Sequence, residues 1–177
     1  LGVLETMMQP DFRTGMGFDV HALVHHDFNT PAAHRNIRIW GVDVPSEFKS
    51  EGHSDGDVCL HALTGAIFGA ISAGDLGVHF PPGEPQWRGA DSSRFLLVAR
   101  QMLMEKNAML MNVDVTLIAQ KPRISPYREE MRERIAEILD IELQRVSVKA
   151  TTTDHLGFAG RGEGIAAQAI VTVSVSG

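Results

Sequence analysis

Three residues carry side chains that could together hold a metal ion. Asp19 and His21 are two positions apart, so on an extended strand their side chains point to the same face. His61 lies in a stretch, residues 57–63, that is typical of the first turns of a helix. One carboxylate and two imidazoles suit catalytic zinc, because they leave the fourth tetrahedral position for water or substrate. The spacing alone has little specificity, since such residues are more often a turn aspartate and hydrogen-bonded histidines.

The elements that must position these residues alternate between strands and helices. Apolar patterning predicts strands or hairpins over residues 12–20, 37–44, 113–118, 146–151 and 165–175. Helical periodicity predicts one helix that begins after Ser54 or Asp55 and reaches Ile71, a second that begins after Asp91 or Ser92, and a third from Ser125 to near Asp140. We therefore expect one α+β (mixed α/β) domain over residues 12–177, with residues 1–11 as an N-terminal arm or linker. Its sheet is expected to be mixed and covered by helices on one face, in a ferredoxin-like arrangement.

The helix that carries His61 is expected to have two unlike faces. Small and aliphatic residues recur every three or four positions and predict a buried stripe of Ala62, Leu63, Ala66, Ile67, Ala70 and Ile71. Asp57, His61, Gly65 and Phe68 fall on a different face, which is free for chemistry in this interpretation. Cys59 is expected to face the core as a small hydrophobic residue and not to bind metal.

The composition bounds the class of protein. The chain has 177 residues, of which 44% are apolar, which is enough for one domain with a full core. A net charge of −6 without a basic stripe argues against nucleic acid as a partner. No apolar run approaches the roughly 20 residues that span a bilayer, and residues 1–15 lack the features of a signal peptide. With a single cysteine, these features predict a cytoplasmic (bacterial) protein without a membrane partner.

Four longer stretches carry a resemblance to a known family. They are GMGFDVH (15–21), GHSDGDVCLHAL (52–63), GDLGVHFPP (74–82) and KATTTDHLGFAGRGEGIA (149–166). From Phe12 to Val175 the sequence resembles the 2-C-methyl-D-erythritol 2,4-cyclodiphosphate synthase family. The resemblance implies a phosphorus–oxygen lyase of non-mevalonate isoprenoid biosynthesis. Such an enzyme cyclises 4-diphosphocytidyl-2-C-methyl-D-erythritol 2-phosphate to 2-C-methyl-D-erythritol 2,4-cyclodiphosphate, in a metal-dependent intramolecular reaction that releases CMP.

The resemblance also implies the metal ligands and the catalytic residues. The zinc ligands of the family fall on Asp19, His21 and His61, the residues already chosen for their chemistry, with one Zn²⁺ per chain. His53 and Thr152 match catalytic positions that stabilise the transition state.

Further residues match the family's second metal and its substrate contacts. Asp154 matches a ligand of a second ion, Mg²⁺ or Mn²⁺, that bridges the substrate phosphates. The implied substrate-binding residues are Ser54, Asp75, Gly77, Arg123, Thr151, Thr153, Phe158 and Arg161. In this comparison Asp75 and Gly77 contact substrate hydroxyls, and residues 119–125 form the cytidine pocket.

The sequence departs from the family pattern at a few positions. Gly65 and Pro82 stand where aspartate is usual, Arg123 replaces a lysine, and Asp154 replaces a glutamate. Gly65 and Pro82 keep open the alternative of a non-catalytic relative that binds nucleotide or isoprenoid phosphates. A zinc phosphohydrolase that uses a metal-bound hydroxide is a third interpretation, but it requires a general base that the sequence does not identify.

The last predicted strand bears on the assembly. In residues 165–175 one face is wholly apolar and the other carries Ala166, Ile170 and little charge. A strand that is apolar on both sides needs cover on both sides. Together with the resemblance, this predicts a homotrimer whose sheets form its core and whose active sites lie between subunits. Phe158, Arg161 and Glu163 would line the axis, where a cavity could hold an isoprenoid diphosphate; the alternative is a buried strand in a monomer.

Overall fold

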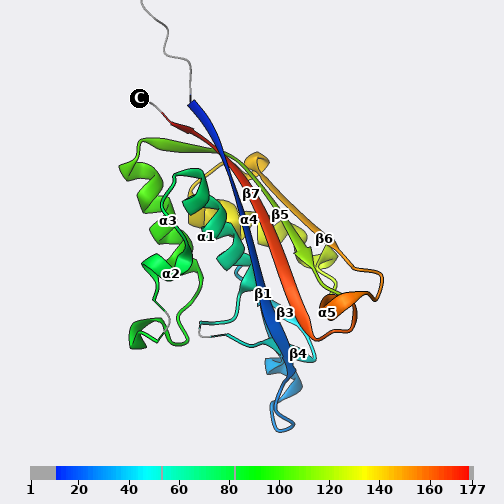
Figure 1. Ribbon diagram of the computed structural model, residues 1–177. Coiled ribbons are helices and arrows are strands. Elements are labelled where there is room, and N and C mark those ends of the chain that lie inside the picture. The colour runs from blue at the N-terminus through cyan, green and yellow to red at the C-terminus, as the bar shows by residue number, and fades with distance from the viewer. Residues whose placement is uncertain (1–10, 53, 82, 176–177) are drawn as a thin grey trace, which may run out of the picture.

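A five-stranded mixed sheet forms the centre of the molecule (Figure 1). The computed structural model describes residues 11–52, 54–81 and 83–175. In spatial order the strands are β4 (Phe48–Ser50), β1 (Asp11–His25), β7 (Gly164–Val175), β5 (Ala108–Ile118) and β6 (Val146–Thr151). β5 and β6 are parallel, and the other neighbouring pairs are antiparallel. A separate hairpin of β2 (Asn36–Ile39) and β3 (Val42–Pro45) turns at Trp40 and Gly41.

Three long helices cover one face of this sheet (Figure 1). They are α1 (Val58–Ala70), which packs on β1 and β7, α3 (Ser93–Glu105), which packs on β5, and α4 (Arg128–Leu139), which packs on β6. Two helices of a single turn are α2 (Leu76–His79) and α5 (Gly157–Gly160), and 3-10 turns occupy residues 32–34, 85–87, 125–127 and 143–145. In the described ranges no helix combines the length and the apolar content that crossing a membrane requires.

The prediction of an α+β domain with a mixed sheet and helices on one face is confirmed, but the ferredoxin-like arrangement is wrong. The main elements follow the order β-α-β-α-β-β with β5 and β6 parallel, whereas ferredoxin-like folds follow β-α-β-β-α-β. Several bounds also differ from expectation, and β5 begins at Ala108, five residues before the predicted strand over 113–118. β1 begins at Asp11, inside the expected arm, and reaches His25 because it pairs first with β7 and then with β4. The third long helix begins at Arg128, after a 3-10 turn over Ser125–Tyr127.

Helix α1 begins at a buried aspartate. Asp57 is its N-cap and accepts hydrogen bonds from two backbone N–H groups of the first turn. The same carboxylate accepts the backbone N–H groups of Trp40 and Gly41, so it ties the start of the helix to the β2–β3 turn. Burial raises the pKa of Asp57, and the N–H donors oppose that rise. The expectation that Ser54 or Asp55 caps this helix is therefore wrong.

Helix α1 is buried nearly all round and not along one stripe alone. The six residues of the predicted stripe are buried, and Cys59 faces the core as expected. Phe68, expected on the open face, is fully buried and lies against the ring of His79. The reason is that α1 lies between the sheet on one side and α2 and α3 on the other. Among the residues of α1, His61, Gly65 and Gly69 keep some exposed surface.

Two glycines let β1 lie directly against α1. A Cβ atom on Gly15 would lie 2.0 Å from the carbonyl oxygen of Ala66, and one on Gly17 would lie 1.9 Å from that of Ala62. Any side chain at these positions would push the strand away from the helix. Because the same face of β1 continues to the predicted metal ligands, this contact sets how closely they approach α1.

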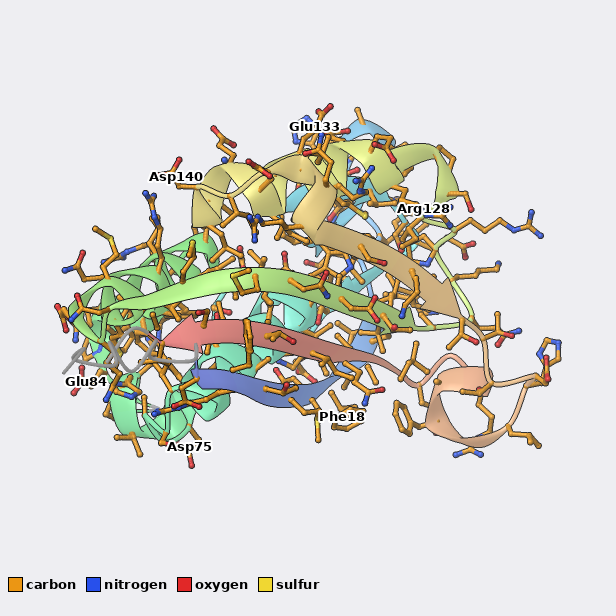
Figure 2. The ribbon with its side chains drawn as sticks, turned by 90° about the horizontal axis from the view of Figure 1, so that it is seen from above. Phe18, Asp75, Glu84, Arg128, Glu133 and Asp140 are labelled. Atoms are coloured by element: carbon orange, nitrogen blue, oxygen red, sulfur yellow. The ribbon has the colours of Figure 1, made fainter. Side chains whose placement is uncertain are left out.

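The face of the sheet away from the long helices is apolar and open. Its exposed apolar side chains include Phe12, Met16, Phe18, Met109 and Ile170, and a few polar residues such as Gln168 and Asp114 lie among them. Phe18 is 57% exposed, and Figure 2 shows it projecting from β1 to the side away from α4. On the helix side, β7 buries Ile165, Ala167, Ala169, Val171 and Val173, as its alternation predicts. The sheet thus has one covered face and one uncovered apolar face.

Candidate metal centre

Strand β1 and helix α1 bring Asp19, His21 and His61 together. One ligand atom of each residue lies within 4.8 Å of the other two. Asp19 Oδ2 is 3.2 Å from His21 Nε2 and 3.1 Å from His61 Nδ1. The two imidazole rings meet edge to face, with centroids 5.1 Å apart. All three residues are half-buried, so the cluster is partly shielded from water and still accessible.

The second nitrogen of His21 is held by the segment before α1. His21 Nδ1 is 3.0 Å from Ser50 Oγ and 3.2 Å from the carbonyl oxygen of Gly56. A carbonyl oxygen only accepts hydrogen bonds, so Nδ1 is the donor and carries the proton. His21 Nε2 is then the nitrogen that faces Asp19 and that would bind a metal ion.

His61 is held in a similar way from the opposite side. Its Nε2 atom lies 3.0 Å from Ser54 Oγ and 3.0 Å from Ser92 Oγ. Its Nδ1 atom faces Asp19. Each ring therefore directs one nitrogen at the same carboxylate oxygen, while serine or backbone groups engage its other nitrogen.

Partial burial and mutual charge shift the ionisation of this cluster. Burial raises the pKa of Asp19, but hydrogen bonds with His21 and His61 outweigh it and hold that pKa well below its usual range. Burial lowers the pKa of His21, yet the hydrogen bond and the negative charge of Asp19 leave that pKa above its ordinary value. Both net shifts have one cause, since a carboxylate at this point favours a positive charge beside it.

The donor set fits a zinc ion. Ligand atoms about 2.0–2.1 Å from a tetrahedral ion lie roughly 3.3–3.4 Å apart, and the distances from Asp19 to the two nitrogens are close to that. The positive charge of a bound ion would replace the imidazole protons that otherwise face the Asp19 carboxylate. The outer nitrogens already have the partners that orient metal-bound histidines in proteins.

An aromatic cavity of about 760 Å³ opens beside the cluster. Its polar lining includes His21, His61 and Ser54. Its apolar lining includes Phe80, Trp87 and Phe95, whose ring centroids are 4.5 to 5.4 Å apart. Glu51, Glu84 and Arg88 complete the charged lining. A ligand that reaches the metal set from this side would lie against aromatic rings.

A second cavity of about 560 Å³ lies on the other side of the cluster, where Asp19 and His61 line it together with the start of α2. Asp75 is the N-cap of α2, and Gly77 is the second residue of this helix. Both line this cavity, and Gly65 on α1 does too. The structure therefore places Ser54, Asp75 and Gly77 around the metal set, while His53 and Pro82 lie outside the described residues.

The other predicted site residues lie elsewhere in this chain. All residues that line the two cavities fall between Met16 and Phe95. Thr151 ends β6, and Thr152 and Thr153 follow in a segment where Asp154 has a left-handed φ of 50°. In Figure 2, α5, which follows this segment, lies at the opposite end of the molecule from Asp75.

Arg123, Phe158 and Arg161 line neither of the two cavities. Arg123 is in the segment after β5, which is joined to the end of β6 by the hydrogen bond from Ala119 N to Thr151 O. Phe158 is on α5 and 39% exposed. Arg161 is exposed and pairs with Glu163 at 2.9 Å. One chain thus brings the N-terminal half of the predicted site together, and none of the C-terminal site residues lines either cavity.

Sequence reasoning missed the serine and aromatic residues around the cluster. Ser92 was considered only as a helix cap, although its hydroxyl contacts His61. Trp87 and Phe95 were not linked to the site, because nothing in their spacing indicates that they face a cavity. The serine-rich segment before α3 and the Pro85-Gln-Trp87 turn are signals, but both are common in ordinary loops.

The fold and the cluster define a class: an α+β domain with a two-histidine, one-aspartate site that suits a catalytic metal ion. The model of the YgbB family matches residues 12–174. The chain belongs to the YgbB family.

Individual relatives agree with this assignment. The bifunctional enzyme IspD/IspF of Novosphingobium aromaticivorans is 53% identical over 165 residues, which are 93% of this chain and 40% of that enzyme. IspF of Plasmodium falciparum, solved as a CDP complex, has a TM-score of 0.79 and 30% identity over 94% of this chain and 97% of its own. The 2C-methyl-D-erythritol 2,4-cyclodiphosphate synthase of Plasmodium vivax has a TM-score of 0.77 and 31% identity over 94% and 100%. The sequence resemblance is confirmed, and the chain spans about two fifths of the length of the curated relatives it matches.

Proposed function

We propose that the domain formed by residues 12–177 converts 4-diphosphocytidyl-2-C-methyl-D-erythritol 2-phosphate to 2-C-methyl-D-erythritol 2,4-cyclodiphosphate and CMP, as a cytoplasmic enzyme. The observation that carries this proposal is the convergence of Asp19, His21 and His61 beside two cavities, in a chain of the YgbB family. The CDP complex of the Plasmodium falciparum relative supports a cytidine diphosphate ligand. Synthases with the same fold favour a catalytic chain over a non-catalytic binding protein.

The reaction requires the protein to position the substrate and to stabilise negative charge on the transferred phosphoryl group, and it requires no general base. The 2-phosphate of the substrate attacks the β-phosphorus of the cytidine diphosphate arm, a new P–O bond forms, and the bond to CMP breaks. A phosphate monoester has a second pKa near 6, so the attacking oxygen is already ionised at neutral pH. Bound zinc, with Mg²⁺ or Mn²⁺ beside it, would supply Lewis-acid stabilisation of the charge on the transferred phosphoryl group.

The chain's own residues would then fold the substrate back on itself. Asp75 and Gly77, next to the cluster, would bind the hydroxyls of the erythritol unit. His53 and Thr152 would donate hydrogen bonds to the charge that develops on phosphorus. Ser54 would contact the substrate from the segment that closes the site.

The cytidine end requires residues that line neither cavity beside the cluster in one chain. Arg123 with residues 119–125 would bind the base and ribose, and Thr151 and Thr153 the phosphates. Asp154 would hold the second ion. Because these residues lie apart from the N-terminal half of the site, we infer a homotrimer in which a neighbouring subunit supplies them. The uncovered apolar face of the sheet supports that assembly, since soluble monomers rarely expose such a patch.

The same trimer would place Phe158 and Arg161 near its axis. An isoprenoid diphosphate could bind there through its head group, with its chain along the apolar sheets. Arg161 already pairs with Glu163, so the diphosphate would have to compete with that carboxylate.

Product analysis tests the proposed activity. The zinc- and magnesium-loaded protein is incubated with the cytidine substrate, CMP is measured by chromatography, and the cyclic diphosphate by phosphorus NMR. His61→Ala should abolish both products and lower the zinc content, whereas His34→Ala, which changes an exposed histidine outside the cluster, should leave both unchanged. An intact substrate after incubation with the loaded wild-type protein would refute the proposal.

A further inference from the structure

Ser92 links the metal cluster to a carboxylate that belongs to no assigned site. It is completely buried, and its hydroxyl oxygen lies 3.0 Å from His61 Nε2. The same hydroxyl is hydrogen-bonded to Asp55 Oδ1. Asp55 Oδ2 accepts the backbone N–H of Ser92 at 3.0 Å, so both carboxylate oxygens grip this one residue.

The donor and the acceptor of each of these hydrogen bonds can be assigned. An ionised carboxylate only accepts hydrogen bonds, so the hydroxyl of Ser92 gives its single proton to Asp55. The lone pairs of the Ser92 oxygen are then left for His61, whose Nε2–H must be the donor. With a proton fixed on Nε2, the neutral ring of His61 would have its lone pair on Nδ1, the atom that faces Asp19 and would bind zinc.

Ser92 does not cap the helix that it precedes. It stands directly before α3, where serine commonly caps a helix, yet its side chain makes no capping hydrogen bond to that helix. The hydroxyl is instead shared among Asp55, His61 and Ser54, whose Oγ atom is 3.2 Å away. The residue that precedes one helix is thus held against the histidine of another.

We propose that Ser92 is a positioning residue for the metal centre. Oriented by Asp55, it selects the tautomer of His61 that offers Nδ1 to zinc and fixes the plane of the ring. This inference rests on the metal set of the proposed function, but it concerns metal binding and does not depend on the reaction. Mutation of a residue that hydrogen-bonds a metal-binding histidine typically lowers the metal affinity 10–100-fold.

The test compares Ser92→Ala with Ser93→Ala in the zinc affinity of the full chain. Ser93 is the next residue and also buried, and its hydrogen-bond partner is Asp91 and not the metal cluster. We expect Ser92→Ala to weaken zinc binding about 10–100-fold in competition with a chelator. Ser93→Ala should stay within about twofold of the wild type. The visible spectrum of the Co²⁺-loaded protein, which reports ligand geometry, should change in Ser92→Ala alone.

A second variant keeps the proposal testable if Ser92→Ala does not fold. Asp55→Asn is nearly isosteric, and its amide would direct N–H donors at the Ser92 oxygen and turn the hydroxyl proton toward His61. Zinc affinity should fall there too. Wild-type affinity and an unchanged Co²⁺ spectrum in either folded variant would overturn the proposal. A wild type that binds zinc but releases no CMP would refute the proposed function and leave this inference standing, and a wild type without zinc affinity would overturn both.

Discussion

The two histidines of the metal centre present different nitrogens to Asp19. His21 offers Nε2, the ring nitrogen farther from its own backbone, and His61 offers Nδ1, the nitrogen nearer to its own backbone. The difference follows from their elements. His21 projects from β1 alongside Asp19, whereas His61 projects from α1, across the contact between strand and helix. Neither histidine can therefore replace the other in the geometry of the site.

The first prediction separates catalysis from metal binding. Thr152 lies beyond the end of β6 and outside the cluster, so Thr152→Ala should leave zinc affinity unchanged. If Thr152 donates to charge in the transition state, kcat should fall by roughly 10²–10³-fold. Steady-state rates measured beside zinc content check this, with Thr30→Ala, in the segment after β1, as a control. Loss of zinc in step with activity would contradict the assignment of Thr152, and the same test applies to His53.

At the scale of elements, the distance between β1 and α1 decides whether a metal site exists at all. Asp19 and His21 come from the strand, and His61 comes from the helix. The glycines of β1 allow its backbone to touch the helix where a side chain would separate them. The helix in turn is fixed at its start by Asp57, which also holds the β2–β3 turn.

Gly17→Ala should therefore damage both stability and metal binding. Its Cβ would lie 1.9 Å from a backbone oxygen of α1, so the strand must move, at a cost of about 3 kcal/mol in the free energy of unfolding. Gly69→Ala is the matched control in the same contact. Its Cβ would meet β1 no closer than 3.8 Å, and alanine favours the helix by up to about 1 kcal/mol.

Denaturant unfolding of both variants, with zinc titrations, measures these effects. Gly17→Ala should unfold at lower denaturant and bind zinc more weakly, and Gly69→Ala should match or exceed the wild type in both. Equal stability of the two variants would show that the contact of Gly17 with α1 does not set the distance between β1 and α1.

Patterns of local origin were predictable, and contacts between segments distant in the sequence were not. The strands over 146–151 and 165–175 and the same-face placement of Asp19 and His21 follow from periodicity. The role of Asp57 could not be read locally, because its partners at the β2–β3 turn lie far from it in the chain. Phe68 was misplaced for a similar reason, since only tertiary packing brings α2 over that side of α1.

At the scale of the whole molecule, the uncovered sheet face and the divided site have one explanation. Each chain holds the metal set on β1 and α1 and the segment of Thr151 to Asp154 beyond β6, with β7 and β5 between them, and its open sheet face lacks cover in one chain. A three-fold packing of these sheets would cover the faces and could unite complementary halves of neighbouring sites.

Sedimentation equilibrium tests this assembly. The mass should be about three times the 19.3 kDa of one chain. Ile170→Glu places a charge on the open face and should produce monomers without cyclase activity, while Leu97→Glu, on exposed α3 surface, should remain trimeric and active. A fully active wild-type protein with the mass of one chain at micromolar concentration would refute the shared site.

The chain has a single cysteine, and α1 buries it two residues before His61. Burial also raises the pKa of this thiol, so Cys59 is unreactive while the helix stays packed. A thiol reagent can attack only when α1 opens, so the labelling rate of Cys59 reports how often this helix opens. Zinc bound to His61 should lower the labelling rate of Cys59 about 100-fold when its concentration is a hundred times its Kd. The His61→Ala variant should be labelled at the metal-free rate with or without zinc. Labelling of the wild type at one rate in both conditions would show that α1 opens independently of the metal.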